Sequence, residues 1–96
     1  MGRTRVPRSL VKEVAEHANT WRNKMLIEQG RLVEAITAIK QTLRHYPEIK
    51  LPVDFWTIDF SERIAKRVRK KARRWKKRVT VEFIVREILS ECDLPT

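Results

Sequence analysis

The sequence has few of the residues that build disulfide frameworks or glycine-rich loops. It contains one cysteine, Cys92, and two glycines, Gly2 and Gly30, among its 96 residues. A single cysteine excludes an internal disulfide framework and fits a reducing compartment. Two isolated glycines cannot form the glycine-rich loop that cradles nucleotide phosphates. These absences argue against disulfide-stapled scaffolds and phosphate-loop enzymes.

Long apolar runs are also missing. No apolar stretch approaches the length of about 20 residues that a membrane-spanning helix needs. The basic start MGRTRVPR is not followed by an apolar run, so it does not have the pattern of a secretory signal. Val6 breaks the myristoylation pattern. We therefore expect a soluble intracellular protein, located in the cytoplasm or associated with the nucleoid.

Catalytic and metal-binding patterns are equally sparse. Glu13, Glu16 and His17 would share one helix face, which superficially suits a metal, but no second set of ligands accompanies them. His45 has no neighbouring nucleophile. We therefore expect no enzyme activity, no metal and no other cofactor.

The most informative absence is that of acidic side chains from residues 63–78. This stretch, RIAKRVRKKARRWKKR, holds eleven Lys or Arg and no Asp or Glu. The whole chain has 22 basic and 12 acidic side chains, a net charge of +10, and the other 80 residues hold 11 basic and 12 acidic side chains, a net charge of −1. A calculated pI near 10.5 points first to nucleic acid as a partner.

The basic stretch also has the apolar period of a helix. Ser61 is placed to cap its start. The remaining faces carry six like-charge pairs four residues apart, which together cost about 1–3 kcal/mol. A face selected only for solubility would interleave Glu, so we expect a polyanionic partner. The apolar stripe, predicted to be core, consists of Ile64, Val68, Ala72, Trp75 and Val79.

The N-terminal half has a different helical pattern. Residues 1–8 are predicted to be a basic arm with Arg3, Arg5 and Arg8, which either lies along phosphates or is a frayed terminus. Residues 9–46 carry a seam of apolar residues with a period of about 3.5, including Trp21. They form either one helix of roughly 55 Å or, as we favour, two helices that meet near Gly30.

Two shorter segments connect these halves. Residues 47–53 contain two prolines and are typical of an extended connector. Residues 54–60, DFWTIDF, suit either a strand with Trp56, Ile58 and Phe60 on one side or a loop that places aromatic side chains on a helical core. Thr80 is placed to cap a last amphipathic helix over residues 80–91.

The order of strand (54–60), helix (61–76) and helix (80–91) resembles the ribbon-helix-helix family of DNA-binding dimers. The resemblance rests on the alternating WTIDF, its direct passage into a helix, and the tight turn before VTVEFIVREIL. It implies a homodimer whose paired strands lie in the major groove of DNA. Thr57, with Phe55 and Asp59, would then face the bases. Thr80 would approach a phosphate at the start of the last helix.

The predicted fold is therefore mainly α, with a helical N-terminal half and a C-terminal strand-helix-helix unit over residues 54–96. The alternative is an all-α helical bundle. The predicted function is nucleic-acid binding, as a transcriptional regulator or a plasmid or phage accessory protein. The candidate nucleic-acid-binding residues are Thr57, Lys66, Arg67, Arg69, Lys70, Arg73, Arg74, Lys77, Arg78 and Thr80.

Two other functions fit the same basic helix. An all-α bundle would use it to track the backbone of RNA or of a single strand, as a subunit of a ribonucleoprotein assembly. A basic amphipathic helix can also bind an anionic membrane surface or a partner protein. The first predicts little sequence preference, and the second predicts binding to anionic vesicles.

Overall fold

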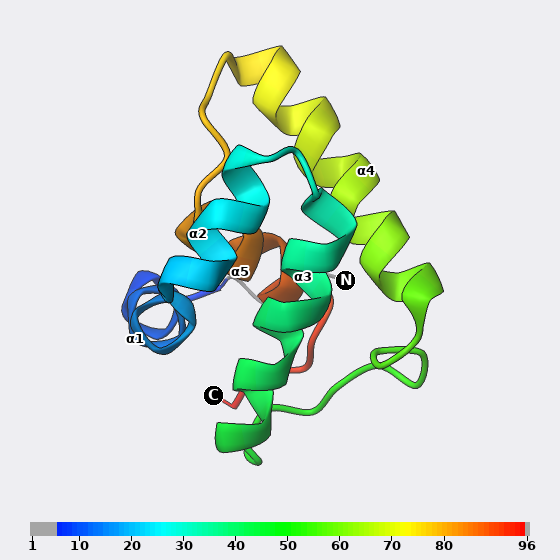
Figure 1. The fold of residues 1–96 in the computed structure, drawn as a ribbon. Helices are drawn as coiled ribbons and strands as arrows, with labels where there is room; N and C mark the ends of the chain where they lie inside the picture. Colours follow the sequence, from blue (N-terminus) through cyan, green and yellow to red (C-terminus); the bar gives the residue numbers. More distant parts are fainter. Residues whose placement is uncertain (1–5, 96) are drawn as a thin grey trace.

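The computed structural model describes residues 6–95, and these form a helical bundle (Figure 1). No strand forms among these residues, and the only β-type pairing in them is an isolated bridge between Lys50 and Asp93. The mainly α prediction is confirmed, and the architecture fits the all-α alternative. The helices are α1 (Arg8–Ala18), α2 (Trp21–Glu28), α3 (Leu32–Lys40), the 3-10 helix η1 (Gln41–His45), α4 (Ile58–Trp75) and α5 (Val81–Leu89).

The predicted seam over residues 9–46 is broken twice. The expected break at Gly30 is present, with a φ of 75° that glycine adopts without steric cost. The break between α1 and α2 was not predicted. The Thr20 hydroxyl accepts a hydrogen bond from the backbone N–H of Asn23 at 3.2 Å, and this cap starts a new helix at Trp21. Because the helix restarts, Trp21 is 76% exposed instead of lying in an apolar seam.

The predicted strand over residues 54–60 is wrong. Residues 53–56 turn, and α4 begins at Ile58, three residues before the predicted start. Thr57 is the N-cap, with its hydroxyl accepting from the Phe60 amide at 3.2 Å. The predicted cap, Ser61, is buried inside the helix. The ribbon that the family resemblance requires therefore does not form in this structure.

The burial pattern of this segment follows a loop and a helix. Phe55 and Phe60 are fully buried, with ring centroids 4.8 Å apart. Trp56 and Ile58, which a strand would have placed in the core beside Phe60, are 42% and 56% exposed. Phe60 and Ile64 then repeat at the helical spacing of four residues. The alternative reading, a loop that places aromatics on a helical core, describes the segment.

One apolar core joins the two halves of the chain. α3 packs against α4, and α1 packs against α5, so elements far apart in sequence lie side by side (Figure 1). Fully buried residues come from each of these helices: Val14, Ile36, Ile39, Ile64, Val68, Ile84 and Ile88.

Lys40, the last residue of α3, ties the loop before α4 to this core. Its ammonium donates hydrogen bonds to the carbonyl oxygens of Phe55, at 2.8 Å, and Thr57, at 3.0 Å. Burial lowers the pKa of Lys40, and the charge of Asp54 opposes that shift. A buried backbone carbonyl without a hydrogen-bond donor would be costly, and Lys40 supplies that donor to both carbonyls. The loop can therefore pack against the end of the core directly before α4 begins.

Candidate nucleic-acid interface

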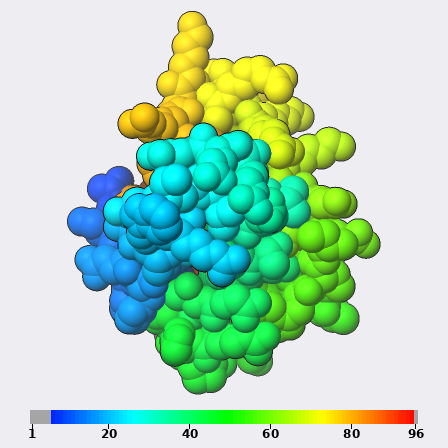
Figure 2. All heavy atoms as spheres, viewed as in Figure 1, coloured from blue at the N-terminus to red at the C-terminus, as the bar shows by residue number. Residues whose placement is uncertain are grey.

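The first half of α4 is anchored in the core and its second half projects beyond it. Phe60, Ile64 and Val68 are fully buried, but no residue of α4 after Val68 is buried. The yellow end of α4 accordingly extends past its neighbours (Figures 1 and 2). Trp75 is the last residue of the helix, and the C-cap Lys76 has a left-handed conformation with φ 53° and donates its amide hydrogen to the Ala72 carbonyl.

One row of cations on α4 faces the acids of α5. Glu87 is almost fully buried, and its carboxylate lies 3.1 Å from Arg67 Nη2 and 2.9 Å from Lys71 Nζ. Arg67 also pairs with Glu91 and donates to the Ser90 hydroxyl. We call this row the inner row; it consists of Arg63, Arg67 and Lys71, spaced four residues apart.

Arg63 continues the inner row toward the start of α4. Its Nη1 lies 2.9 Å from Asp54 Oδ2, and its Nη2 lies 3.7 Å from Glu91 Oε1. The hydrogen bond from Arg63 lowers the pKa of Asp54 below its usual value. All three cations of the inner row are therefore paired within the protein, and they hold α4 against α5 and the preceding loop.

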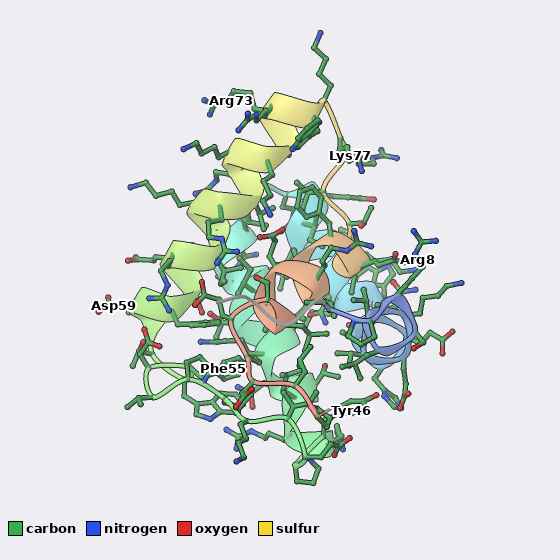
Figure 3. All side chains as sticks on the ribbon, turned by 180° about the vertical axis from the view of Figure 1, so that it is seen from behind. Arg8, Tyr46, Phe55, Asp59, Arg73 and Lys77 are labelled. Atoms are coloured by element: carbon green, nitrogen blue, oxygen red, sulfur yellow. The ribbon has the colours of Figure 1, made fainter. Side chains whose placement is uncertain are left out.

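The other cations of the stretch have a different environment. Each side chain is exposed, and none forms an ion pair with an acid within residues 6–95. In the view from behind, Arg73 and Lys77 lie at the opposite end of α4 from Asp59 (Figure 3). We call these cations the basic surface; they are Lys66, Arg69, Lys70, Arg73, Arg74, Lys76, Lys77 and Arg78.

Seven of the ten predicted site residues lie on the basic surface. Arg67 does not, because it belongs to the inner row and its guanidinium is paired with Glu87 and Glu91. The hydroxyls of Thr57 and Thr80 are engaged as helix caps, accepting from the amides of Phe60 and Phe83. Thr57 also donates to the Asp54 carbonyl at 2.6 Å. The structure therefore brings the predicted cations together and gives the two threonines a local structural role.

The prediction that Trp75 belongs to the core is wrong. Trp75 continues the apolar stripe of α4, but it is 63% exposed because the helix outruns the core. The guanidinium of Arg74 lies over its ring, 5.7 Å from the centroid. The sequence did contain a signal of this exposure. Trp75 has a basic residue on each side, and the stripe position before it is held by the small Ala72, so the apolar stripe weakens after Val68.

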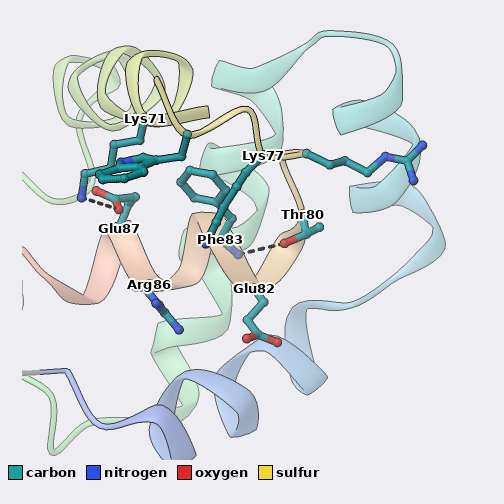
Figure 4. Close-up of a pocket in the computed structure, with 9 residues that line it drawn as sticks. Lys71, Lys77, Thr80, Glu82, Phe83, Arg86 and Glu87 are labelled. Atoms are coloured by element: carbon teal, nitrogen blue, oxygen red, sulfur yellow. Dashed lines mark hydrogen bonds and ion pairs between the residues drawn. The ribbon is translucent and has the colours of Figure 1, made fainter. Parts of the chain in front are cut away.

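An open groove of about 500 Å³ lies beside the projecting end of α4 (Figure 4). Its walls come from the last turns of α4, the linker to α5, and the first turns of α5. Trp75 and Phe83 supply its aromatic surface, and Lys77, Arg78 and Arg86 are among its cations. The groove thus combines aromatic and cationic side chains next to the basic surface.

The remaining candidates show no reactive arrangement. Among residues 6–95, no group of three or more His, Cys, Asp or Glu is placed to hold a metal ion. His17 instead contacts the Tyr46 hydroxyl through Nδ1. Burial raises the pKa of the Cys92 thiol to about 12, so it stays protonated at neutral pH.

The predicted basic arm is described only in part. Arg3 and Arg5 lie outside the described residues, and Arg8 is exposed at the first turn of α1 (Figure 3). Comparison with protein-family models, curated proteins and solved structures finds no significant match to this chain. Function is therefore inferred from the geometry and charge of the site.

Proposed function

We propose that this protein binds nucleic acid through the phosphate backbone, using the basic surface at the projecting end of α4. The observation that carries the proposal is the contrast on one helix. Three cations are paired with acids, while the other eight cations of the stretch have no acidic partner in the described chain. Phosphates would neutralise this surface, and release of their counterions would drive binding.

The location of the basic surface favours a long polyanion over a small anion. α4 has 18 residues, so it is about 27 Å long at 1.5 Å per residue. The unpaired cations continue from Lys66 to Arg78, past the end of the helix. A phosphate backbone presents regularly spaced charges over such a length. Phosphate contacts alone carry no sequence information, so we expect little sequence preference.

The membrane-surface alternative is less compatible with the packing of α4. A helix that lies in a lipid interface needs its apolar face free. The first half of the apolar face of α4 is instead buried in the protein through Ile64, Ala65 and Val68, and only its end, at Trp75, is exposed. No described helix is long and apolar enough to cross a bilayer. Binding through the basic surface needs only one chain, so a homodimer or larger assembly stays a separate prediction.

The test removes four cations from the basic surface with R69Q/K70Q/R73Q/R74Q. Binding is measured on single-stranded DNA, duplex DNA and RNA of equal length at about 50 and about 200 mM salt. We expect the slope of log K against log salt to become shallower by about 3, because each phosphate contact contributes about 0.7 to 0.9. On a single strand, raising the salt from about 50 to about 200 mM should therefore weaken binding of this variant about fiftyfold less than it weakens binding of the wild type.

The matched control is K12Q/R22Q/K24Q/K50Q, which removes the same charge from exposed positions that make no ion pair within residues 6–95. We expect it to keep most of the affinity and nearly the whole slope. Circular dichroism checks that both variants are folded. Equal affinities and slopes for the two variants would exclude the basic surface as the binding site.

A further inference from the structure

The groove beside the projecting end of α4 has an aromatic surface that the phosphate contacts do not use. Trp75 is 63% exposed, whereas the average Trp side chain in a folded protein is mostly buried. Phe83, half-buried at the start of α5, lines the same groove. The volume of about 500 Å³ is within the range of small-ligand sites. Although the Arg74 guanidinium lies over the ring, 5.7 Å from its centroid, most of the Trp75 side chain remains exposed for stacking.

The charges around the groove are mainly positive. Lys77 and Arg78 belong to the basic surface and continue it to the groove, and Lys71 and Arg86 also line it. Of the two acids in the lining, Glu82 and Glu87, Glu87 is already paired with Lys71. The aromatic surface of Trp75 and Phe83 lies among these charges and suits the flat face of a neutral group. The phosphates that flank such a group would lie on the surrounding cations.

We propose that the groove takes an unpaired nucleobase of a single-stranded segment, stacked on Trp75 and beside Phe83, with the flanking phosphates on Lys77 and Arg78. This inference rests on the proposed function and specifies its ligand. A base in a duplex has both faces covered by its neighbours, so only an unpaired base can stack on the indole. Stacking on aromatics is tolerant of sequence because every base has a π-face.

The experiment compares two single strands of equal length and equal phosphate number, oligothymidylate and a strand with abasic residues. We expect the wild-type protein to bind oligothymidylate roughly 5- to 150-fold more tightly, the range measured for one stacked base. Trp75→Ala should reduce this ratio to about one and leave binding of the abasic strand unchanged. Trp75→Phe, which retains a stacking ring, should keep a large part of the ratio.

Trp21→Ala is the matched control, because Trp21 is also strongly exposed and does not line the groove. It should keep the full ratio. If Trp75→Ala keeps the ratio as well, the base-stacking inference is overturned. The same holds if a duplex of equal length binds as tightly as oligothymidylate.

The two proposals fail in different ways. Binding of both strands with a steep salt slope and no dependence on Trp75 would overturn the stacking site and leave the proposed function in place. Failure of the wild-type protein to bind any of the strands would overturn both. Because Trp75 is 63% exposed and surface substitutions usually change stability little, we expect Trp75→Ala to unfold close to the wild-type temperature, which circular dichroism checks.

Discussion

The inner row and the basic surface consist of the same residue types on the same helix, and they differ only in their neighbours. Arg67 and Lys71 have the buried carboxylate of Glu87 at 3.1 and 2.9 Å. Lys66 and Lys70, each one residue earlier in the chain, face away and have no ion pair within residues 6–95. Charge density in the sequence therefore does not show which cations are paired with an acid of the same chain; the tertiary structure does.

The two ends of α4 differ in a related way. At its start, Thr57 and Lys40 fix the backbone, and Phe60 and Ile64 are buried. At its end, apolar burial stops while the cations continue. The helix is therefore anchored in the core at its start and carries exposed cations at its end. The predictions below test this division, from the largest expected effect to the smallest.

The first prediction compares two pairs of cations four residues apart. R67Q/K71Q should lower the free energy of unfolding by roughly 2–4 kcal/mol, because Glu87 stays buried without a cation, and breaking a buried pair costs about 3–5 kcal/mol. K66Q/K70Q removes an equal charge but relieves a like-charge pair. It should therefore leave stability unchanged or raise it by about 0.2–0.5 kcal/mol.

Urea unfolding followed by circular dichroism measures both variants, and strand binding measured in parallel completes the comparison. K66Q/K70Q should weaken binding while the fold remains intact. If both variants lose the same stability, the distinction between the inner row and the basic surface is wrong.

The second prediction concerns Thr57, which the family resemblance placed against the bases. Thr57 caps α4, so Thr57→Ala should lower the free energy of unfolding by about 1 kcal/mol. Thr80→Ala, at the cap of α5, should cost a similar amount for the same reason. Thr57→Ser keeps the hydroxyl and should recover most of the loss. A selection experiment on random duplexes should show no change in sequence preference with Thr57→Ala; a changed preference would favour base readout.

The third prediction concerns the exposed end of the inner row. Arg63 lowers the pKa of Asp54 in the folded protein, so the pair stabilises the fold fully only above the unfolded pKa of about 3.9. Asp54→Asn should therefore be less stable than the wild type at neutral pH. The difference should decrease as the pH falls through the lowered folded pKa, where the wild-type carboxylate becomes protonated.

Urea unfolding from neutral to acidic pH measures this effect, with Asp93→Asn as the control at an exposed acid that makes no ion pair in the described part of the chain. The control should show no comparable dependence on pH. A difference between Asp54→Asn and the wild type that persists at the lowest pH would mean that the Arg63 pair is not its cause.

Local signals in the sequence were reliable where a single interaction decides the structure. Thr80 caps α5 as expected, since a hydroxyl before an apolar period can bond the first free amides whatever lies around it. Gly30 marks a turn because glycine adopts positive φ without cost. Thr20 and Thr57 have the same capping chemistry, but neither was predicted to be a cap. The continuous apolar pattern around Thr20 favoured an unbroken helical seam, and the alternating aromatics around Thr57 favoured a strand.

By itself, the sequence determined a mainly helical chain, the position of its last amphipathic helix, and the concentration of charge in residues 63–78. These properties depend on neighbours within one or two helical turns. Only the tertiary structure decided which cations meet an acid, that Phe55 is buried and Trp56 is not, and where the core ends along α4. Periodicity defines the face on which a side chain lies, whereas burial depends on whether another element covers that face. Trp75 lies on the apolar face of α4, and no helix reaches far enough to cover it.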